Sequence, residues 1–357
     1  MENIQKETNF AKAFYIFAFM FLAVYALNSL STILTPIAIA ILIWFLINAL
    51  ASQIKRLPFL SPKVADIVAI PLSLIFIVYF MIEIGSFITS SMMELSSTIS
   101  QLDSKINILI EKLTLMTSID FTTPLQKFFQ EFSLSGVINK VISAFSAIFS
   151  NLIQIFLYVL FLLIDQQFFG AKLNALFPKK ENRIRVEHIL VSISKGVKTY
   201  IFITTLVSLL TGFLTFVICE IFSLQGAVLW GFIAFVLNFI PTIGSIIAVL
   251  IPTIFALIQF PLISDVLFLT LCLVIIQFLI GNIIYPKLMG NKLNISQFVV
   301  IVSLVVWGAM WGTIGMFLSV PLMMILLIIC SQFEGSKKLA ILISADGNIL
   351  TKSQFSK

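Results

Sequence analysis

The sequence predicts an all-α membrane protein, a polytopic bundle of about eight spanning helices, and three observations predict that class. The 357 residues are 60% hydrophobic and only 11% charged, whereas a soluble domain is about 45–50% apolar and about 25% charged. The apolar residues gather in runs near the ~20 residues needed to cross a bilayer. Lys and Arg gather in the short segments between runs, as in cytoplasmic loops.

The predicted spans follow one another along the chain. Their apolar runs lie at 11–33, 36–50, 64–88, 146–164, 199–221, 226–240, 243–260, 263–285 and 298–330. Between Thr199 and Pro286 only Glu220 and Asp265 carry a charge. The first run is longer than the apolar core of a signal peptide and has no clear small-residue cleavage site, so we interpret it as a span.

The basic loops predict the orientation. Lys and Arg occupy 51–63 and 165–198, whereas the loops on the other side carry none. The positive-inside rule then predicts that both termini lie on the cytoplasmic side of a bacterial cytoplasmic membrane. Both flanks of 298–330 are basic, so this run is expected to enter and leave on the same side. It should be a hairpin or re-entrant pair broken near the glycines Gly308, Gly312 and Gly315.

Residues 90–145 interrupt the spans with an amphipathic, Ser- and Thr-rich insert on the extracytoplasmic side. Its apolar residues recur at heptad-like steps of three and four. Two interpretations stay open: interfacial or packed helices within one subunit, and a coiled-coil-like contact in a homo-oligomer. The predicted organisation is therefore spans 1–3 in 1–89, the insert 90–145, a transport core 146–333 and a cytoplasmic tail 334–357.

Broken helices at 238–252 and 307–321 are the strongest pointers to a transport site. Irregular backbone at membrane depth is tolerated where it is buried in protein or lines a cavity. Both segments carry Thr-Ile-Gly followed by a proline, a weak signal of an internal repeat. The alternative for the glycines is close helix packing, as in the GxxxG pair of the second segment. The candidate path residues here are Asn238, Pro241, Gly244, Ser245, Pro252, Gly308, Gly312, Gly315 and Pro321.

Several classes of chemistry find no support in the sequence. There is no P-loop for ATP and no HExxH motif for a metalloprotease, and His188, the single histidine, lies in a basic loop. The three cysteines are scattered in apolar runs without CxxC spacing. We therefore expect no enzyme activity, cofactor or metal. The net charge of +6 reflects cytoplasmic loops, so nucleic acid is not an expected partner.

Two carboxylates are candidates for coupling transport to protons or cations. Glu83 lies within an apolar run and Asp165 lies at the end of another. An ionisable side chain inside a span is expensive and is read as functional by default. The alternative for Glu83 is a position at the outer interface, where its span passes into the insert.

Four motifs from about residue 146 onward resemble the autoinducer-2 exporter family, also called PerM-like permeases. They are Phe161-Leu-Leu-Ile-Asp165 with Phe177-Pro178, Leu237-Asn-Phe-Ile-Pro-Thr-Ile-Gly-Ser245 with Pro252, Gly281-Asn-Ile-Ile-Tyr-Pro-Lys-Leu-Met-Gly290, and Trp307-Gly308 through Pro321. The resemblance implies a permease of roughly eight spans. The family includes a signal exporter and members associated with sodium/proton exchange. One departure is Tyr285, where many members have an acidic residue before the proline.

The functional prediction is a permease that exports a small polar molecule such as autoinducer-2 through a lipid bilayer. The third motif adds the candidate path residues Asn282, Pro286 and Gly290, and Asn238 and Asn282 are expected to supply polar contacts. Two alternatives remain. One is a sodium/proton antiporter of the same family, which moves monovalent cations. The other is a non-transporting oligomeric envelope protein organised by the insert.

Overall fold

The computed structural model describes residues 14–15, 18–19, 21–56, 58, 61–100, 150–290 and 294–347. Helices make up nearly all of these residues, and their β-pairing is limited to an isolated bridge between Ile295 and Ser344. The predicted all-α class is therefore confirmed. The start of the first predicted span and residues 101–145 of the predicted insert lie outside the described residues.

Six helices of the described chain are long and apolar enough to cross a membrane. They are α2 (Ser31–Ile54), the Pro62–Glu83 part of α3 (Pro62–Ser100), the continuous Leu152–Leu176 segment of α7 (Leu152–Asp165) and α8 (Phe169–Leu176), α9 (Lys180–Ile221), the Ile263–Met289 segment of α12 (Ile263–Leu279) and α13 (Tyr285–Met289), and α14 (Gln297–Ser331). Two shorter apolar helices, α10 (Ala227–Leu237) and α11 (Ile243–Gln259), are each below the ~20 residues that a full crossing needs.

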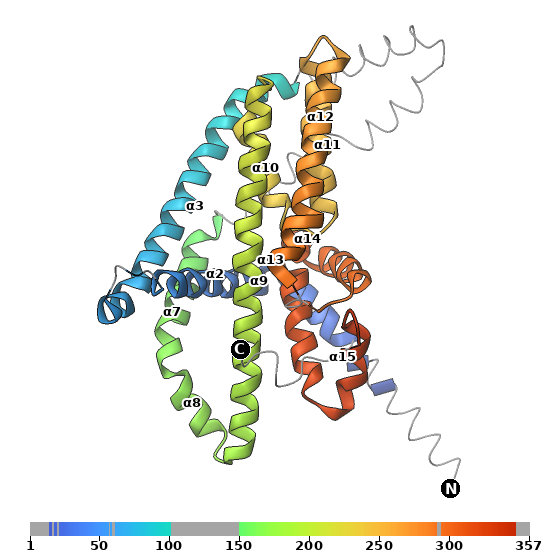
Figure 1. The fold of residues 1–357 in the computed structure, drawn as a ribbon. Helices are drawn as coiled ribbons and strands as arrows, with labels where there is room; N and C mark the ends of the chain where they lie inside the picture. The colour runs from blue at the N-terminus through green and yellow to red at the C-terminus, as the bar shows by residue number, and fades with distance from the viewer. Residues whose placement is uncertain are drawn as a thin grey trace, which may run out of the picture.

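Helix α9 is the longest described helix and packs against α2, α10, α12, α13 and α14 (Figure 1). Its 42 residues correspond to about 63 Å at 1.5 Å per residue, about twice the ~30 Å hydrocarbon core. The sequence predicted a span from residue 199, but the helix begins at Lys180. The charged stretch before residue 199 stays helical because one face of it, including Ile189 and Val197, is buried in the protein core.

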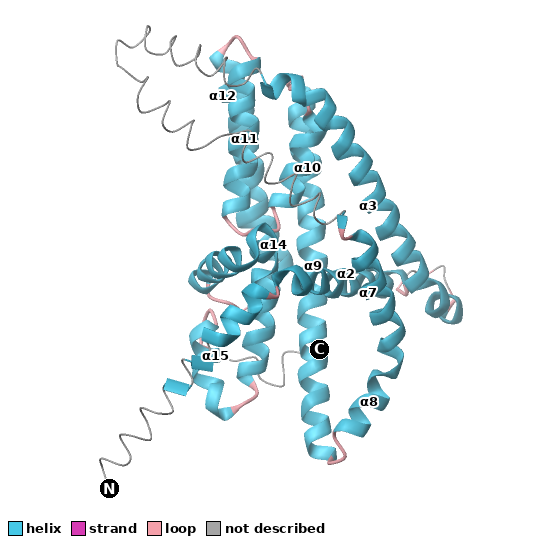
Figure 2. Cartoon of the chain, turned by 180° about the vertical axis from the view of Figure 1, so that it is seen from behind, coloured by secondary structure: helices cyan, strands magenta, loops and turns pink. Residues whose placement is uncertain are grey.

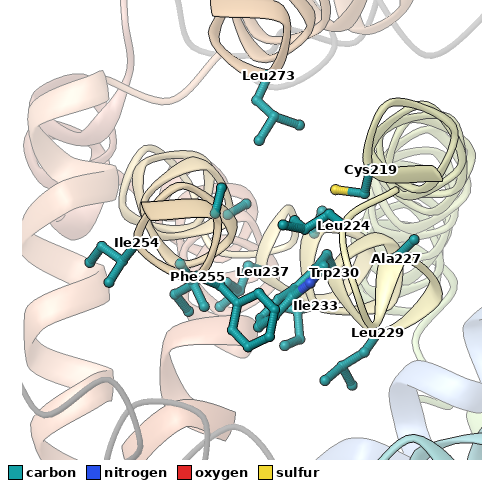
Figure 3. Close-up of a cluster of buried hydrophobic side chains, with 14 of the residues drawn as sticks. Cys219, Leu224, Ala227, Leu229, Trp230, Ile233, Leu237, Ile254, Phe255 and Leu273 are labelled. Atoms are coloured by element: carbon teal, nitrogen blue, oxygen red, sulfur yellow. The ribbon is translucent and has the colours of Figure 1, made fainter. Parts of the chain in front are cut away.

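Helices α10 and α11 form a hairpin against the part of α9 that leads to Ile221 (Figure 1). Gly212 of α9 and Gly231 of α10 are the point of closest approach, because a Cβ on either residue would lie 2.7 Å from the backbone oxygen of the other. Next to this contact, the rings of Trp230 in α10 and Phe255 in α11 pack with centroids 5.1 Å apart. Their side chains converge with that of Leu237 in one apolar cluster (Figure 3). The α10–α11 hairpin is thus fixed to α9 by small-residue contact and apolar burial.

Helix α14 is also a hairpin, as the charge pattern predicted. Gly312 has φ 61° and ψ −144°, which breaks the helix between a first arm, 297–311, and a second arm, 313–331. The Ser303 hydroxyl donates to the Ser319 carbonyl oxygen over 3.1 Å although the two residues are 16 positions apart. In a continuous helix that separation would be about 24 Å.

The second arm of α14 packs along the other half of α9 (Figure 1). A Cβ on Gly196 would lie 2.9 Å from the Met324 sulfur. Near the beginning of α9, the Arg185 guanidinium donates to the Gln332 carbonyl and lies 4.9 Å from the centroid of the Phe333 ring. The predicted tail is packed through its first part, because α15 (Lys337–Ile343) buries Ala340 and Ile343 in the same core.

Helices α2, α3 and α7 lie together beside α9 (Figure 2), and α2 also contacts α14. A separate core cluster joins them and contains Ala40, Ile47, Ile77, Ile155 and Val159. The break before α2 occurs at Leu30, several residues earlier than the sequence predicted. Helix α3 continues without interruption to Ser100, so the first part of the predicted insert extends a spanning helix.

Candidate functional site

The turn of the α10–α11 hairpin, residues 238–242, places a polar pair deep in an apolar region. The Asn238 side-chain amide donates to the Ser208 hydroxyl of α9 over 2.9 Å, and Ser208 is fully buried. Ser208 lies within the apolar part of α9, about 14 Å of helix after Thr199 and about 20 Å before Ile221. A hydroxyl buried in an apolar surrounding needs such a partner, and Asn238, itself half-buried, supplies it to Ser208.

The absence of a side chain at Gly244 allows the backbone of this turn to pack tightly. A Cβ at Gly244 would lie 1.7 Å from the Leu237 carbonyl oxygen, so no side chain fits there. Thr242, two residues earlier, has φ 63°, a strained conformation for a β-branched residue. Pro241 lies within the turn, Ser245 in the first turn of α11, and Pro252 is buried inside α11.

The turn of the α14 hairpin has the same construction. A Cβ at Gly315 would lie 1.9 Å from the carbonyl oxygen of Trp307 in the first arm. In the same way, a Cβ at Gly244 would meet the carbonyl oxygen of Leu237 in α10. Both glycines end a Thr-Ile-Gly string, and Pro321 is buried in the second arm as Pro252 is in α11. Gly308 faces Met316 across its own hairpin, and a Cβ added at Gly308 would lie 2.9 Å from the Met316 Cγ atom. Gly312 is not helical, so it does not share one helical GxxxG face with Gly308. The close contact of Gly308 with Met316 agrees with the packing alternative for that glycine.

The two hairpins meet near their turns. The rings of Phe239 and Phe317 stack with centroids 4.6 Å apart, and Phe235 meets Phe239 edge-on at 5.5 Å. Trp311, next to the α14 turn, donates its indole N–H to the Leu27 carbonyl over 3.0 Å. The two broken segments predicted as the path are therefore brought together.

The hairpins approach this meeting point from the two ends of α9. At the open end of the α10–α11 hairpin, Gln259 accepts from the Gln225 backbone N–H and donates to the Ser223 carbonyl, each over 2.8 Å. Ser223 and Gln225 lie in the short loop that follows the last residue of α9, Ile221. The α14 hairpin is held at the opposite end through Arg185. This arrangement of two discontinuous helix pairs around a polar point is typical of secondary transporters.

The third group of predicted path residues lies apart from the hairpin turns. Asn282 is exposed, and its amide donates to the Phe278 carbonyl of its own helix over 3.2 Å. Its position two residues after the buried Ile280 explains this, because such residues point to different sides of a helix. Pro286 is exposed in α13, and Gly290 has φ 52° where that helix ends.

The two coupling candidates lie on the outside of the described structure. Glu83 is exposed on α3. Asp165 is exposed and pairs with Lys172 over 2.6 Å, in a solvent-accessible ion pair. Among the described residues, no group of three or more His, Cys, Asp or Glu side chains is placed to hold a metal ion.

Sequence reasoning missed the α9 side of the site. Ser208, Phe239 and Phe317 were not singled out, although the first pairs with Asn238 and the other two join the hairpins. A signal was present in α9, where small, hydroxyl or tyrosine side chains recur at every fourth residue. These are Ser192, Gly196, Tyr200, Thr204, Ser208 and Gly212, all of them buried. Such a stripe marks the face of a helix that meets other helices.

The fold and the paired hairpins define an integral membrane protein of the transporter class. The sequence pattern of the family described as "AI-2E family transporter" matches residues 14–335. The chain belongs to this family, so it is a membrane transport protein, and the resemblance found in the motifs is confirmed. The family is one of transporters and not of enzymes, and it implies a lipid bilayer and a small solute as partners.

Three relatives show how far the similarity extends. The AI-2 transport protein TqsA of Escherichia coli is 27% identical over 317 residues, 87% of this chain and 89% of the relative. A putative transport protein of Haemophilus influenzae is 31% identical over 265 residues, 71% and 73% of the two chains. A putative transport protein of Borreliella burgdorferi is 38% identical over 193 residues, 54% of this chain and about half (53%) of the relative. These relatives give no support to the antiporter alternative.

Proposed function

We propose that this protein exports a small polar molecule such as autoinducer-2 across a bacterial cytoplasmic membrane, along a path between the two hairpin turns. The observation that carries the proposal is the meeting of two broken helix pairs at the bond between the half-buried Asn238 and the buried Ser208. The choice of autoinducer-2 as the substrate rests on the E. coli relative, which is named an AI-2 transport protein and aligns over most of both chains. The positive-inside rule places both termini in the cytoplasm.

The two hairpins supply separate barriers for alternating access. Each has its turn near the middle of α9 and its open end at a different end of that helix. A displacement of one turn would open the polar pair to one side while the other hairpin keeps the opposite side closed. The Phe239–Phe317 stack is the contact that such a displacement breaks.

The chemistry of the path favours a solute without net charge. Asn238 and Ser208 offer an amide and a hydroxyl. The only charged residues between Thr199 and Pro286 are Glu220, which is exposed, and Asp265, which lies in the first turn of α12. We therefore propose transport without sodium or proton coupling, and assign Glu83 and Asp165 no coupling role. The homo-oligomeric state remains a prediction from the 90–145 insert.

Flux measurements in proteoliposomes test the proposal. Purified protein should move labelled autoinducer-2 down its own gradient at a rate that imposed sodium and proton gradients leave unchanged. Empty liposomes are the control. Absence of flux under every condition would contradict the transport of this substrate. Flux that follows one cation gradient would contradict uncoupled transport and return attention to the carboxylates.

A further inference from the structure

A second group of polar side chains lies on α9, next to the hairpin site. Tyr200 and Thr204 are almost completely buried, at 4% and 2% exposure. The Thr204 hydroxyl lies 3.5 Å from the hydroxyl of Tyr285 in α13, and either oxygen is able to donate. Three hydroxyl-bearing side chains from two helices therefore gather inside an apolar core.

A π-helix positions Tyr285 for this contact. Residues Ile280–Ile284 form a π-turn between α12 and α13. Before the π-turn, the core-facing residues Val266, Leu269 and Leu273 are three and four positions apart, as in an α-helix. Across the π-turn, the core-facing residues Ile280 and Tyr285 are five positions apart. Short π-helical segments are rare and occur frequently at functional sites.

An unpartnered hydroxyl connects this group to the hairpin turn. The Thr205 hydroxyl is buried and has no hydrogen-bond partner among the described atoms. Thr205 is one turn from Ser208, which accepts from Asn238. A buried hydroxyl without a partner is unfavourable, and polar solute or water supplies the missing bond in such places.

The charge nearest in sequence lies on a different side of α9. Lys198 is two residues before Tyr200, and its ammonium group lies 6.0 Å from the centre of the Trp44 ring in α2. Residues two apart on a helix point about 200° apart. Tyr200 and Thr204 therefore offer hydroxyl groups and no formal charge to a ligand.

We propose that Tyr200, Thr204, Thr205 and Tyr285 form a second binding site on the path, which takes an uncharged, hydroxyl-bearing solute. This inference rests on the proposed transport function and adds a position to it. The solute exchanges hydrogen bonds with the threonine and tyrosine hydroxyls next to the π-helix. From there it reaches Ser208 and Asn238 one turn away along α9.

Equilibrium binding of labelled autoinducer-2 to the purified full-length protein tests the site. Thr204→Val and Tyr285→Phe each remove one hydroxyl with little change of volume, and each is expected to weaken binding about 5- to 10-fold. Thr270→Val is the matched control, because Thr270 pairs with Thr253 over 3.0 Å between α11 and α12, away from this group. It should bind as the unmodified protein does. Thermal unfolding of all three variants identifies any that fail to fold.

Competition with unlabelled compounds shows whether the site prefers an uncharged solute to an anionic one. Ribitol, an uncharged polyol, should displace labelled autoinducer-2, whereas ribonate, a carboxylate of the same length, should not. Unchanged binding in both Thr204→Val and Tyr285→Phe would overturn the second site, and so would stronger displacement by ribonate. If the unmodified protein transports autoinducer-2 while both variants transport equally well, the second site fails and the proposed function stands. If the unmodified protein transports none, the proposed function itself fails.

Discussion

Replacing Gly244 with alanine is expected to reduce autoinducer-2 flux to the background of empty liposomes. The added Cβ would lie 1.7 Å from the Leu237 carbonyl oxygen, so the turn of the α10–α11 hairpin must open. Overpacking of this kind costs ~1–3 kcal/mol or more. Gly315→Ala should have the same effect on the α14 hairpin, where the Trp307 oxygen is 1.9 Å away. Membrane insertion should persist because the apolar runs are unchanged.

Gly170→Ala is the matched control for both variants. Its Cβ would have no atom within 4 Å, so flux should equal that of the unmodified protein. Thermal stability should be equal or higher, because alanine favours a helix more than glycine does. Flux in proteoliposomes and thermal unfolding in detergent are the two measurements. Normal flux in Gly244→Ala and Gly315→Ala would show that tight turns are not required for transport.

Substituting leucine for Asn238 is expected to lower flux at least about 10-fold while leaving the protein folded. Leucine has a similar size but removes the amide that donates to Ser208. The Ser208 hydroxyl would then be buried without this partner, and a polar solute would lose a contact at the centre of the path. Initial rates at several substrate concentrations measure the loss.

Asn282→Leu is the informative comparison for the other asparagine. Its amide is exposed and bonds only a carbonyl of its own helix among the contacts found for it. Flux should stay within about twofold of the unmodified protein, as for most exposed substitutions. An equal loss in both variants would place Asn282 on the path, as the sequence motif predicted.

The α14 hairpin shows what charge patterning is able to predict. A run of 35 residues reads as one very long helix by hydropathy alone. Basic residues on both flanks required it to return to its starting side, and the glycines supplied the break. The structure places the break at Gly312 and joins the arms through Ser303 and Ser319.

The contacts between the hairpins were beyond reach of the sequence. Phe239 and Phe317 are far apart in a chain with 36 phenylalanines, and nothing local distinguishes this pair from lipid-facing or core residues. Likewise the Gly212–Gly231 approach depends on how α10 crosses α9, which is set by packing. Tertiary geometry, not composition, decides which polar residues meet inside the helix bundle.

Asn282 and the start of α9 illustrate two further limits. Asparagine in an apolar run signals a polar contact, but the helical face decides whether that contact is internal, and here Asn282 is exposed. The segment from Lys180 to Lys198 is too charged to resemble a span, yet it continues the helix because the second arm of α14 packs against it. Periodicity without knowledge of the neighbouring helix does not resolve either case.

Cross-linking of the two hairpin turns tests the central claim most directly. Phe239→Cys and Phe317→Cys, combined in a background without Cys219, Cys272 and Cys330, place thiols where rings now stack with centroids 4.6 Å apart. A short, reducible thiol cross-linker should join them and stop autoinducer-2 flux, and a reductant should restore it. Each single-cysteine variant, treated in the same way, is the control. Undiminished flux through the fully cross-linked protein would contradict a path that opens between the hairpins.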